Sequence, residues 1–178
     1  NTFDFPFVHG KAIKNAGFSF VSCSLGAMLT NEVDLKNYSF VDLILGKQKQ
    51  TYIGNRRKAP EFKTFPLDLQ QKIKSYCQGG GNLLISGSYV ASDFYDGEYV
   101  KSSEKLFLEN VLNVKYSSSV KTSSDKVSVV TSPISVFHKS DFNMFIKPNE
   151  WRYQIETMDG IEPTSSSAIT ICRSGVAN

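Results

Sequence analysis

The chain has 178 residues, of which 40% are hydrophobic and 21% are charged. This length and composition suit one globular domain with its own core and exclude a wholly disordered chain. The formal net charge of +3 is too small to indicate nucleic-acid binding, and the longest apolar runs are far too short to span a membrane.

The first part of the sequence predicts a helix followed by two strands. Residues 7–16 carry a short helical pattern that ends at Gly17, a residue typical of helix stops. Residues 18–24 (FSFVSCS) alternate apolar and polar side chains, which is the period of a half-buried strand. After a mixed stretch with room for one helical turn, the run at 40–46 (FVDLILG) is almost entirely apolar. Such a run is typical of a strand covered on both faces, as in parallel sheets.

Residues 47–65 form a polar, basic connection that is long for a loop. Loops of this length usually bind a ligand or move. Arginine pairs with carboxylates through two parallel hydrogen bonds, and an aromatic ring stacks on a sugar face, so the loop has the side chains to hold an anionic glycan. The candidate binding residues are Lys47, Tyr52, Arg56 and Arg57. The alternative, which composition favours, is an ordinary solvated loop.

The next segment predicts a helix and a strand joined by glycines. The helix covers residues 66–78, with Pro66 in its first turn and an apolar stripe on one side. The Gly79–Gly81 run ends the helix and lets the backbone turn into a strand at 82–86. The polar turn that follows contains Ser86, Gly87 and Ser88, at the edge where open parallel sheets place their ligands.

The second half of the sequence has a different character. A further helix is predicted at 103–112, and the α/β part therefore covers residues 1–113. Short β-type segments separated by turn residues fill 114–178. We expect a single α/β domain over residues 1–178, in which the β-rich portion extends the first sheet or packs beside it.

No pattern in the sequence predicts a metal or a cofactor. The cysteines are too widely spaced for a zinc motif, and we expect them to be buried apolar residues: Cys23, Cys77 and Cys172. The acidic cluster of Asp93, Asp96 and Glu98 lacks the spacing of a calcium loop and is interpreted as a simple turn. We interpret Trp151–Tyr153 as a core or edge-strand cluster rather than as a sugar platform.

Three strings in the sequence resemble one protein family: NTFDFPFVHGKAI at 1–13, VDLILGKQ at 41–48, and LQQKIKSYCQGGGNLLISGSYVASD at 69–93. They are similar to the α/β domain of large secreted Bacteroidetes proteins that are usually labelled xanthan lyases. That domain resembles the class I glutamine amidotransferase fold. The resemblance implies a three-layer, flavodoxin-like, mostly parallel sheet and a secreted or cell-envelope location, and it is weak in the β-rich portion.

The chain departs from that family at both ends. In the family an apolar first strand precedes the NTFDFP-like string, and further strands follow the string that matches Gly175–Ala177. We therefore expect an excerpt of a larger secreted protein, or a divergent version, whose partners include the other domains of its parent chain. If the missing strand is central, another segment fills its place or the region is open.

The resemblance also points to the turn after the strand at 82–86. In amidotransferases of this fold that turn carries a cysteine nucleophile, whereas this chain has Ser86 and Ser88 and no G-x-S-x-G pattern. A serine nucleophile needs a histidine base and an acid that orients it. The candidate bases and orienting acids are His9, His138, Asp93 and Asp141. The interpretation we favour is a degenerate turn whose hydroxyls satisfy backbone amides.

These observations predict a catalytically degenerate, amidotransferase-like domain that binds glycan or acts as a scaffold in a polysaccharide- or cell-wall-directed protein. The alternatives are a polysaccharide lyase of the xanthan-lyase type and a serine-dependent hydrolase or amidase that acts on glycan or peptidoglycan. The expected ligand is an acidic polysaccharide or a cell-wall glycan. We expect no nucleic-acid partner and no transmembrane segment.

Overall fold

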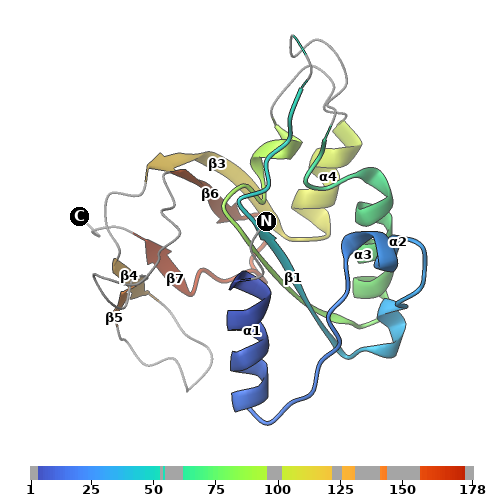
Figure 1. The fold of residues 1–178 in the computed structure, drawn as a ribbon. Coiled ribbons are helices and arrows are strands. Elements are labelled where there is room, and N and C mark those ends of the chain that lie inside the picture. Colours follow the sequence, from blue (N-terminus) through green and yellow to red (C-terminus); the bar gives the residue numbers. More distant parts are fainter. Residues whose placement is uncertain are drawn as a thin grey trace. The chain divides into compact units, whose positions relative to one another are not determined.

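A computed structural model describes residues 4–52, 54, 62–95, 102–121, 126–130, 141–143 and 157–174 of the chain (Figure 1). The chain divides into two compact units, Asn1–Asp93 and Phe94–Asn178. The described residues combine helices with small parallel and antiparallel sheets, in agreement with the α/β prediction. Within these ranges, no helix combines the length and apolarity needed to cross a membrane.

The first unit begins with helix α1 (Asp4–Asn15). The helix ends where the sequence predicts: Gly17 adopts a positive φ of 85°, and the amide of Phe18 donates to the Ile13 carbonyl at 3.2 Å. Glycine suits this position because a side chain would strain the left-handed backbone. Lys14 lies in the last turn, where a cation interacts favourably with the helix dipole.

Two parallel strands form the sheet of this unit. Strand β1 (Phe40–Gly46) matches the predicted range, and β2 (Asn82–Gly87) extends the predicted range by one residue. In their register Asp42 lies opposite Leu84, and Ile44 lies opposite Ser86. Paired residues point to the same face, so these four side chains share one face of the sheet. Figure 1 shows α1 beside β1.

Helix α3 (Leu67–Gln78) connects the two strands, as predicted. Its apolar stripe is buried, with Leu69 fully enclosed and Ile73 2% exposed. The single hydroxyl proton of Tyr76 is shared between two carbonyls, that of Tyr38 at 3.0 Å and that of Asn82 at 3.2 Å. This hydroxyl therefore links the C-terminal end of α3 to the start of β2 and to the residue Tyr38 just before β1.

Two short helices lie between α1 and β1: α2 (Leu25–Leu29) and the 3-10 turn η1 (Leu35–Asn37). Ser24 caps α2 by accepting the Ala27 amide at 3.2 Å, which is the role that serine favours at a helix start. The Lys72 ammonium of α3 donates to the Asn31 side chain, so the segment after α2 is joined to α3.

The predicted strand at 18–24 is wrong. The segment belongs to no sheet, and Phe18, Phe20 and Val21 are 69%, 45% and 60% exposed. An alternating pattern describes a segment that can cover a pleated surface, but a strand also needs a hydrogen-bonded neighbour. Among the described residues β1 pairs only with β2, and the segment remains unpaired.

The prediction that all three cysteines are buried is also wrong. Cys23 and Cys172 are exposed, and Cys77 is half-buried. Cys23 lies in the unpaired segment at 18–24, and its side chain is exposed because this segment joins no sheet in the described residues. Cys77 lies beside the buried stripe of α3, and this partial burial raises the pKa of its thiol.

In the second unit, helix α4 (Ser102–Asn110) starts one residue before the predicted range and ends two residues before its end. The ring of Phe107 on this helix packs against the ring of Phe94, with the two centroids 5.8 Å apart. Leu108, the next residue of the helix, is fully buried. Thr164 ties the end of α4 to a later turn, because its hydroxyl donates to the Glu109 carbonyl at 2.8 Å.

After α4, the described segments of the second half are mostly strands. Strands β3 (Val114–Lys121) and β6 (Thr157–Pro163) form one antiparallel pair. A second antiparallel sheet has the order β5-β4-β7, with bounds Asp141–Asn143, Lys126–Val129 and Cys172–Ser174. In the described ranges these strands form sheets of their own and do not extend the parallel β1–β2 pair.

Candidate functional site at His9, Asp42 and the β2 turn

The first candidate feature is a histidine–aspartate pair between α1 and β1. The Nδ1 atom of His9 lies 2.7 Å from Oδ2 of Asp42, and the two side chains are 26% and 13% exposed. An ionised carboxylate only accepts hydrogen bonds, so Nδ1 of His9 is the donor in this pair and Nε2 is the ring nitrogen outside it. Within the described residues, the second carboxylate oxygen of Asp42, Oδ1, is buried and has no hydrogen-bond partner.

Sequence reasoning selected His9 and missed Asp42. The signal was present: Asp42 is the only charged residue in the apolar run at 40–46, and a carboxylate in a strand that is predicted to be covered on both faces needs a partner. The prediction that Asp93 orients a histidine is wrong for His9, because Asp42 occupies that position. His138 and the side chain of Asp141 lie outside the described residues.

Asp93 instead has a structural role. It is 1% exposed, and its carboxylate accepts the Gln50 amide at 3.1 Å and the Thr64 amide at 2.7 Å. These amides lie at the two ends of the basic loop, and a bridge between Thr51 and Phe62 closes the loop beside them. Two amide donors on one buried carboxylate make a strong, charge-assisted clamp.

The structure places Ser86 within β2, opposite Ile44, and Ser88 in the turn that follows the strand. Ser88 is 6% exposed, and its amide donates to the Gly46 carbonyl at 2.8 Å. Gly87 packs so closely on β1 that an added Cβ would lie 2.9 Å from Cβ of Leu45. Within the described part of the chain, no hydrogen bond joins His9 to Ser86 or Ser88.

The predicted glycan-binding loop is only partly described. Lys47 is exposed and Tyr52 is half-buried, and both interact with other residues. The Lys49 ammonium lies 5.0 Å from the centroid of the Tyr89 ring, a cation–π contact. The remaining residues singled out by the sequence lie outside the described ranges: Arg56, Arg57, Asp96, Glu98 and Trp151–Tyr153.

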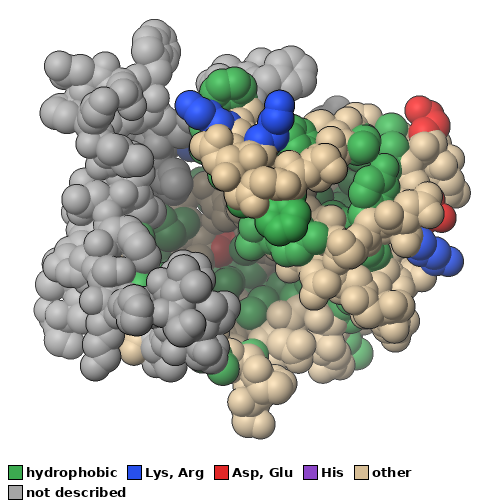
Figure 2. Space-filling view, turned by 90° about the horizontal axis from the view of Figure 1, so that it is seen from below, with side chains coloured by type: hydrophobic (Ala, Val, Ile, Leu, Met, Phe, Trp, Pro, Cys, Tyr) green, Lys and Arg blue, Asp and Glu red, His purple; other side chains and the backbone are tan. Residues whose placement is uncertain are grey.

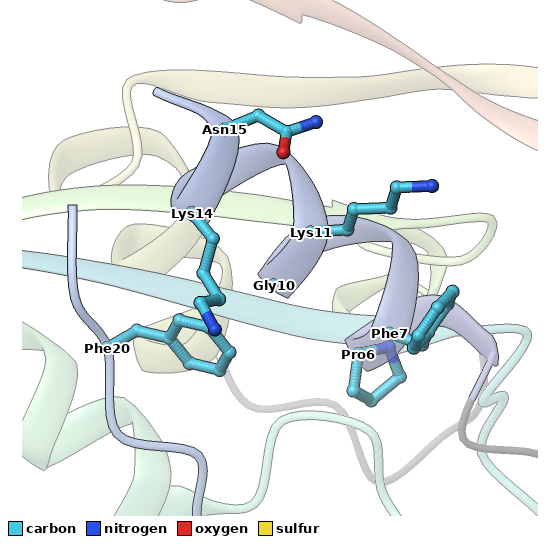
Figure 3. Close-up of a pocket in the computed structure, with 7 residues that line it drawn as sticks. All are labelled: Pro6, Phe7, Gly10, Lys11, Lys14, Asn15 and Phe20. Carbon is cyan, nitrogen blue, oxygen red and sulfur yellow. The ribbon is translucent and has the colours of Figure 1, made fainter. Parts of the chain in front are cut away.

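A groove of about 370 Å³ runs along α1 and was not predicted from the sequence (Figure 3). Its lining residues are Pro6, Phe7, Gly10, Lys11, Lys14, Asn15 and Phe20. The groove exists because the segment after α1 folds back: a Cβ added at Gly10 would lie 2.6 Å from Cζ of Phe20. The sequence signal for this groove was the pair of aromatic residues in the 18–24 segment, Phe18 and Phe20, but we predicted that segment to be a strand.

Hydrophobic side chains also reach the surface beyond this groove (Figure 2). On the first unit the exposed large apolar residues outside the groove include Val8, Phe40, Leu67 and Leu84. Leu84 is 47% exposed and lies on the sheet face that carries Asp42, so this face is open over β2. Among the described residues, no group of three or more histidine, cysteine or acidic side chains is placed to hold a metal ion.

Comparison with protein-family models, with curated proteins and with solved structures finds no match for this chain.

Proposed function

We propose that this chain is a catalytically degenerate domain, related in fold to flavodoxin-like amidotransferases, that binds an acidic polysaccharide or cell-wall glycan. The proposal includes a place in a larger secreted or cell-envelope protein. It rests on the strings at 1–13, 41–48 and 69–93, which resemble such proteins, and on the chemistry of the turn after β2.

The observation that carries the proposal is the use of the β2 turn for packing. A serine nucleophile needs a base within hydrogen-bond reach of its Oγ atom. Within the described residues His9 forms its hydrogen bond with Asp42 and none with either serine, while the Ser88 amide donates to the Gly46 carbonyl. The close contact of Gly87 with Leu45 leaves this turn little freedom to rearrange. A turn occupied in this way supports a structural function rather than acyl transfer.

Two measurements test the proposal on the full chain. The first is affinity for acidic and neutral polysaccharides, where we expect binding of the acidic ones. The second is covalent labelling with a fluorophosphonate probe, where we expect no reaction with the native protein. The variants Ser86→Ala and Ser88→Ala should bind glycan as the native chain does. Serine-specific labelling that disappears in either variant would overturn the assignment as a degenerate domain.

A polysaccharide lyase is the second candidate, and the His9–Asp42 pair favours it. An aspartate-oriented imidazole is a suitable general base. In a lyase reaction Nε2 of His9 would take the proton from the uronate carbon next to the carboxylate. The electron pair would form the new carbon–carbon double bond as the bond between the adjacent ring carbon and the glycosidic oxygen breaks, and the leaving oxygen would take a proton from water.

The lyase hypothesis has a direct readout, because its product contains an unsaturated uronate that absorbs in the ultraviolet. Incubation with acidic glycans should produce this absorbance in the native chain and not in His9→Gln. The matched control is Lys36→Gln, which changes an exposed residue of η1. Absorbance that persists in His9→Gln would exclude His9 as the base, and binding without any absorbance would favour the non-enzymatic function.

A further inference from the structure

The α1 groove has the geometry of a small ligand site on the surface of a helix. Phe7, Lys11 and Lys14 follow one another at spacings of four and three residues, so they share one side of α1. Phe20 reaches back from the following segment and forms the opposite wall (Figure 3). A volume of about 370 Å³ lies within the usual range of small-molecule sites.

Aromatic rings form much of the groove surface and remain accessible. Phe7 is 68% exposed and Phe20 is 45% exposed. The Phe20 ring is positioned by its contact with Gly10, where the missing side chain lets the ring approach the helix backbone. Positioned rings with a free face suit a ligand that has a flat apolar face of its own.

The charge of the groove is entirely positive. Its ionisable lining residues are Lys11 and Lys14, and no acidic side chain lines it. Neither lysine forms an ion pair within the described residues. Figure 3 shows Lys14 extending toward the Phe20 ring and Lys11 lying further along the helix, so the two ammonium groups occupy different parts of the groove. Separate cations favour a ligand that carries repeated negative charges.

We propose that the α1 groove binds an acidic sugar chain through its uronate residues. The carboxylate of one uronate pairs with the Lys14 ammonium, and the apolar face of the same sugar ring packs on Phe20. The Lys11 ammonium pairs with the carboxylate of a neighbouring uronate. Asn15 supplies an amide for the sugar hydroxyls. This inference rests on the proposed glycan-binding function and gives it a site, distinct from the basic loop at 47–65.

The alternative ligand of similar charge is an acidic peptide, and the groove suits it less well. Peptides in extended form are usually held through main-chain hydrogen bonds at a sheet edge. The groove is built on a helix, whose backbone groups are satisfied internally over most of its length. The groove must therefore recognise its ligand mainly through side chains. Aromatic and lysine side chains suit the ring face and the carboxylate of an acidic sugar better than the main chain of a peptide.

Titration of the full chain with a short oligogalacturonate, followed by calorimetry, tests the inference. The double variant Lys11→Gln, Lys14→Gln should bind about tenfold more weakly, because two solvent-exposed charge pairs together contribute on the order of 1.4 kcal/mol, which is tenfold in affinity. Phe7→Ala should also weaken binding. The control Lys36→Gln, Lys74→Gln removes the same charge from exposed positions elsewhere and should bind as the native chain does.

The results of these titrations distinguish binding at the α1 groove from glycan binding elsewhere on the chain. Oligogalacturonate binding that is equal in the groove variant and the control variant overturns the groove and leaves glycan binding intact. The absence of binding to any acidic glycan by the native chain overturns the proposed glycan-binding function itself, and the groove with it. Oligoglutamate that binds as tightly, with the same dependence on Lys11 and Lys14, overturns the acidic sugar as the ligand.

Discussion

His9 on α1 and Asp42 on β1 meet at 2.7 Å although they are 33 residues apart in the sequence. The pair links the first helix of the chain to the parallel sheet. Because Oδ1 of Asp42 is buried and has no hydrogen bond in the described part of the chain, the imidazole is the partner there that offsets the desolvation of this carboxylate. The first prediction concerns the strength of that coupling.

We expect the His9–Asp42 pair to stabilise the first unit measurably. In a double-mutant cycle of His9→Ala, Asp42→Ala and the double variant, the coupling energy should be about 1 kcal/mol, as for residues that share a part-buried hydrogen bond. Urea denaturation measures the four free energies of unfolding. Strictly additive losses would mean that the pair contributes no net stability.

The second prediction concerns alkaline pH. Burial raises the pKa of Tyr76 above its ordinary value of 10.0. The unfolded chain therefore loses this proton at a lower pH than the folded chain. The stabilising contribution is fully present below pH 10.0 and is lost as the pH rises toward and through the higher folded-state pKa.

The variant Tyr76→Phe tests this pH dependence. It removes the hydrogen bonds to Tyr38 and Asn82 and should cost about 1–2 kcal/mol at neutral pH. It should also show a smaller loss of stability above pH 10 than the native chain. Urea denaturation at neutral and alkaline pH gives both values, and an identical alkaline slope in the two proteins would refute the assignment.

A third prediction concerns the glycine run before β2. A Cβ added at Gly81 would overlap the ring of Tyr76, whereas one added at Gly26 would meet only Oγ of Ser24, at 3.7 Å. Gly81→Ala should therefore cost about 1–3 kcal/mol, the usual range for overpacking. The control Gly26→Ala, inside α2, should be neutral or stabilise by about 0.5–1 kcal/mol. Equal thermal stabilities of the two variants would contradict the close packing of Tyr76 on Gly81.

The fourth prediction concerns the clamp that holds the basic loop. Asp93→Ala leaves two buried amides, those of Gln50 and Thr64, without their acceptor. We expect a loss of about 3 kcal/mol, together with faster proteolysis between residues 50 and 64. Asp34→Ala is the control, because among the described residues this exposed aspartate accepts the Lys36 amide alone and its loss should cost about 1 kcal/mol. Similar losses in the two variants would argue against the clamp.

Local pattern predicted most of the first unit and the helix of the second. The strand at 40–46, the helix that ends at Gln78 and the stop at Gly17 were all read from the sequence. Their physical causes are short-range. An apolar run, a helical stripe of buried residues and glycine at a left-handed turn each act within a few residues of the chain.

The candidate sites depended on contacts between distant segments. The acid that pairs with His9, the two amides that bind Asp93 and the Phe20 ring on Gly10 all come from other elements. The sequence showed that a histidine and several acids were present, and it also showed strand-like alternation at 18–24. It could not show which of them meet, because hydrogen bonds and strand pairing need partners whose positions are set by packing.

The sequence alone determined α1, β1, α3, β2 and α4 and the α/β class of the fold. Only the tertiary structure decided that Ser88 is buried and that His9 forms a hydrogen bond with Asp42. It also decided that the 18–24 segment packs on α1 instead of joining the sheet. The reason is physical. Backbone propensity is a property of neighbours along the chain, whereas a site is a property of neighbours in space.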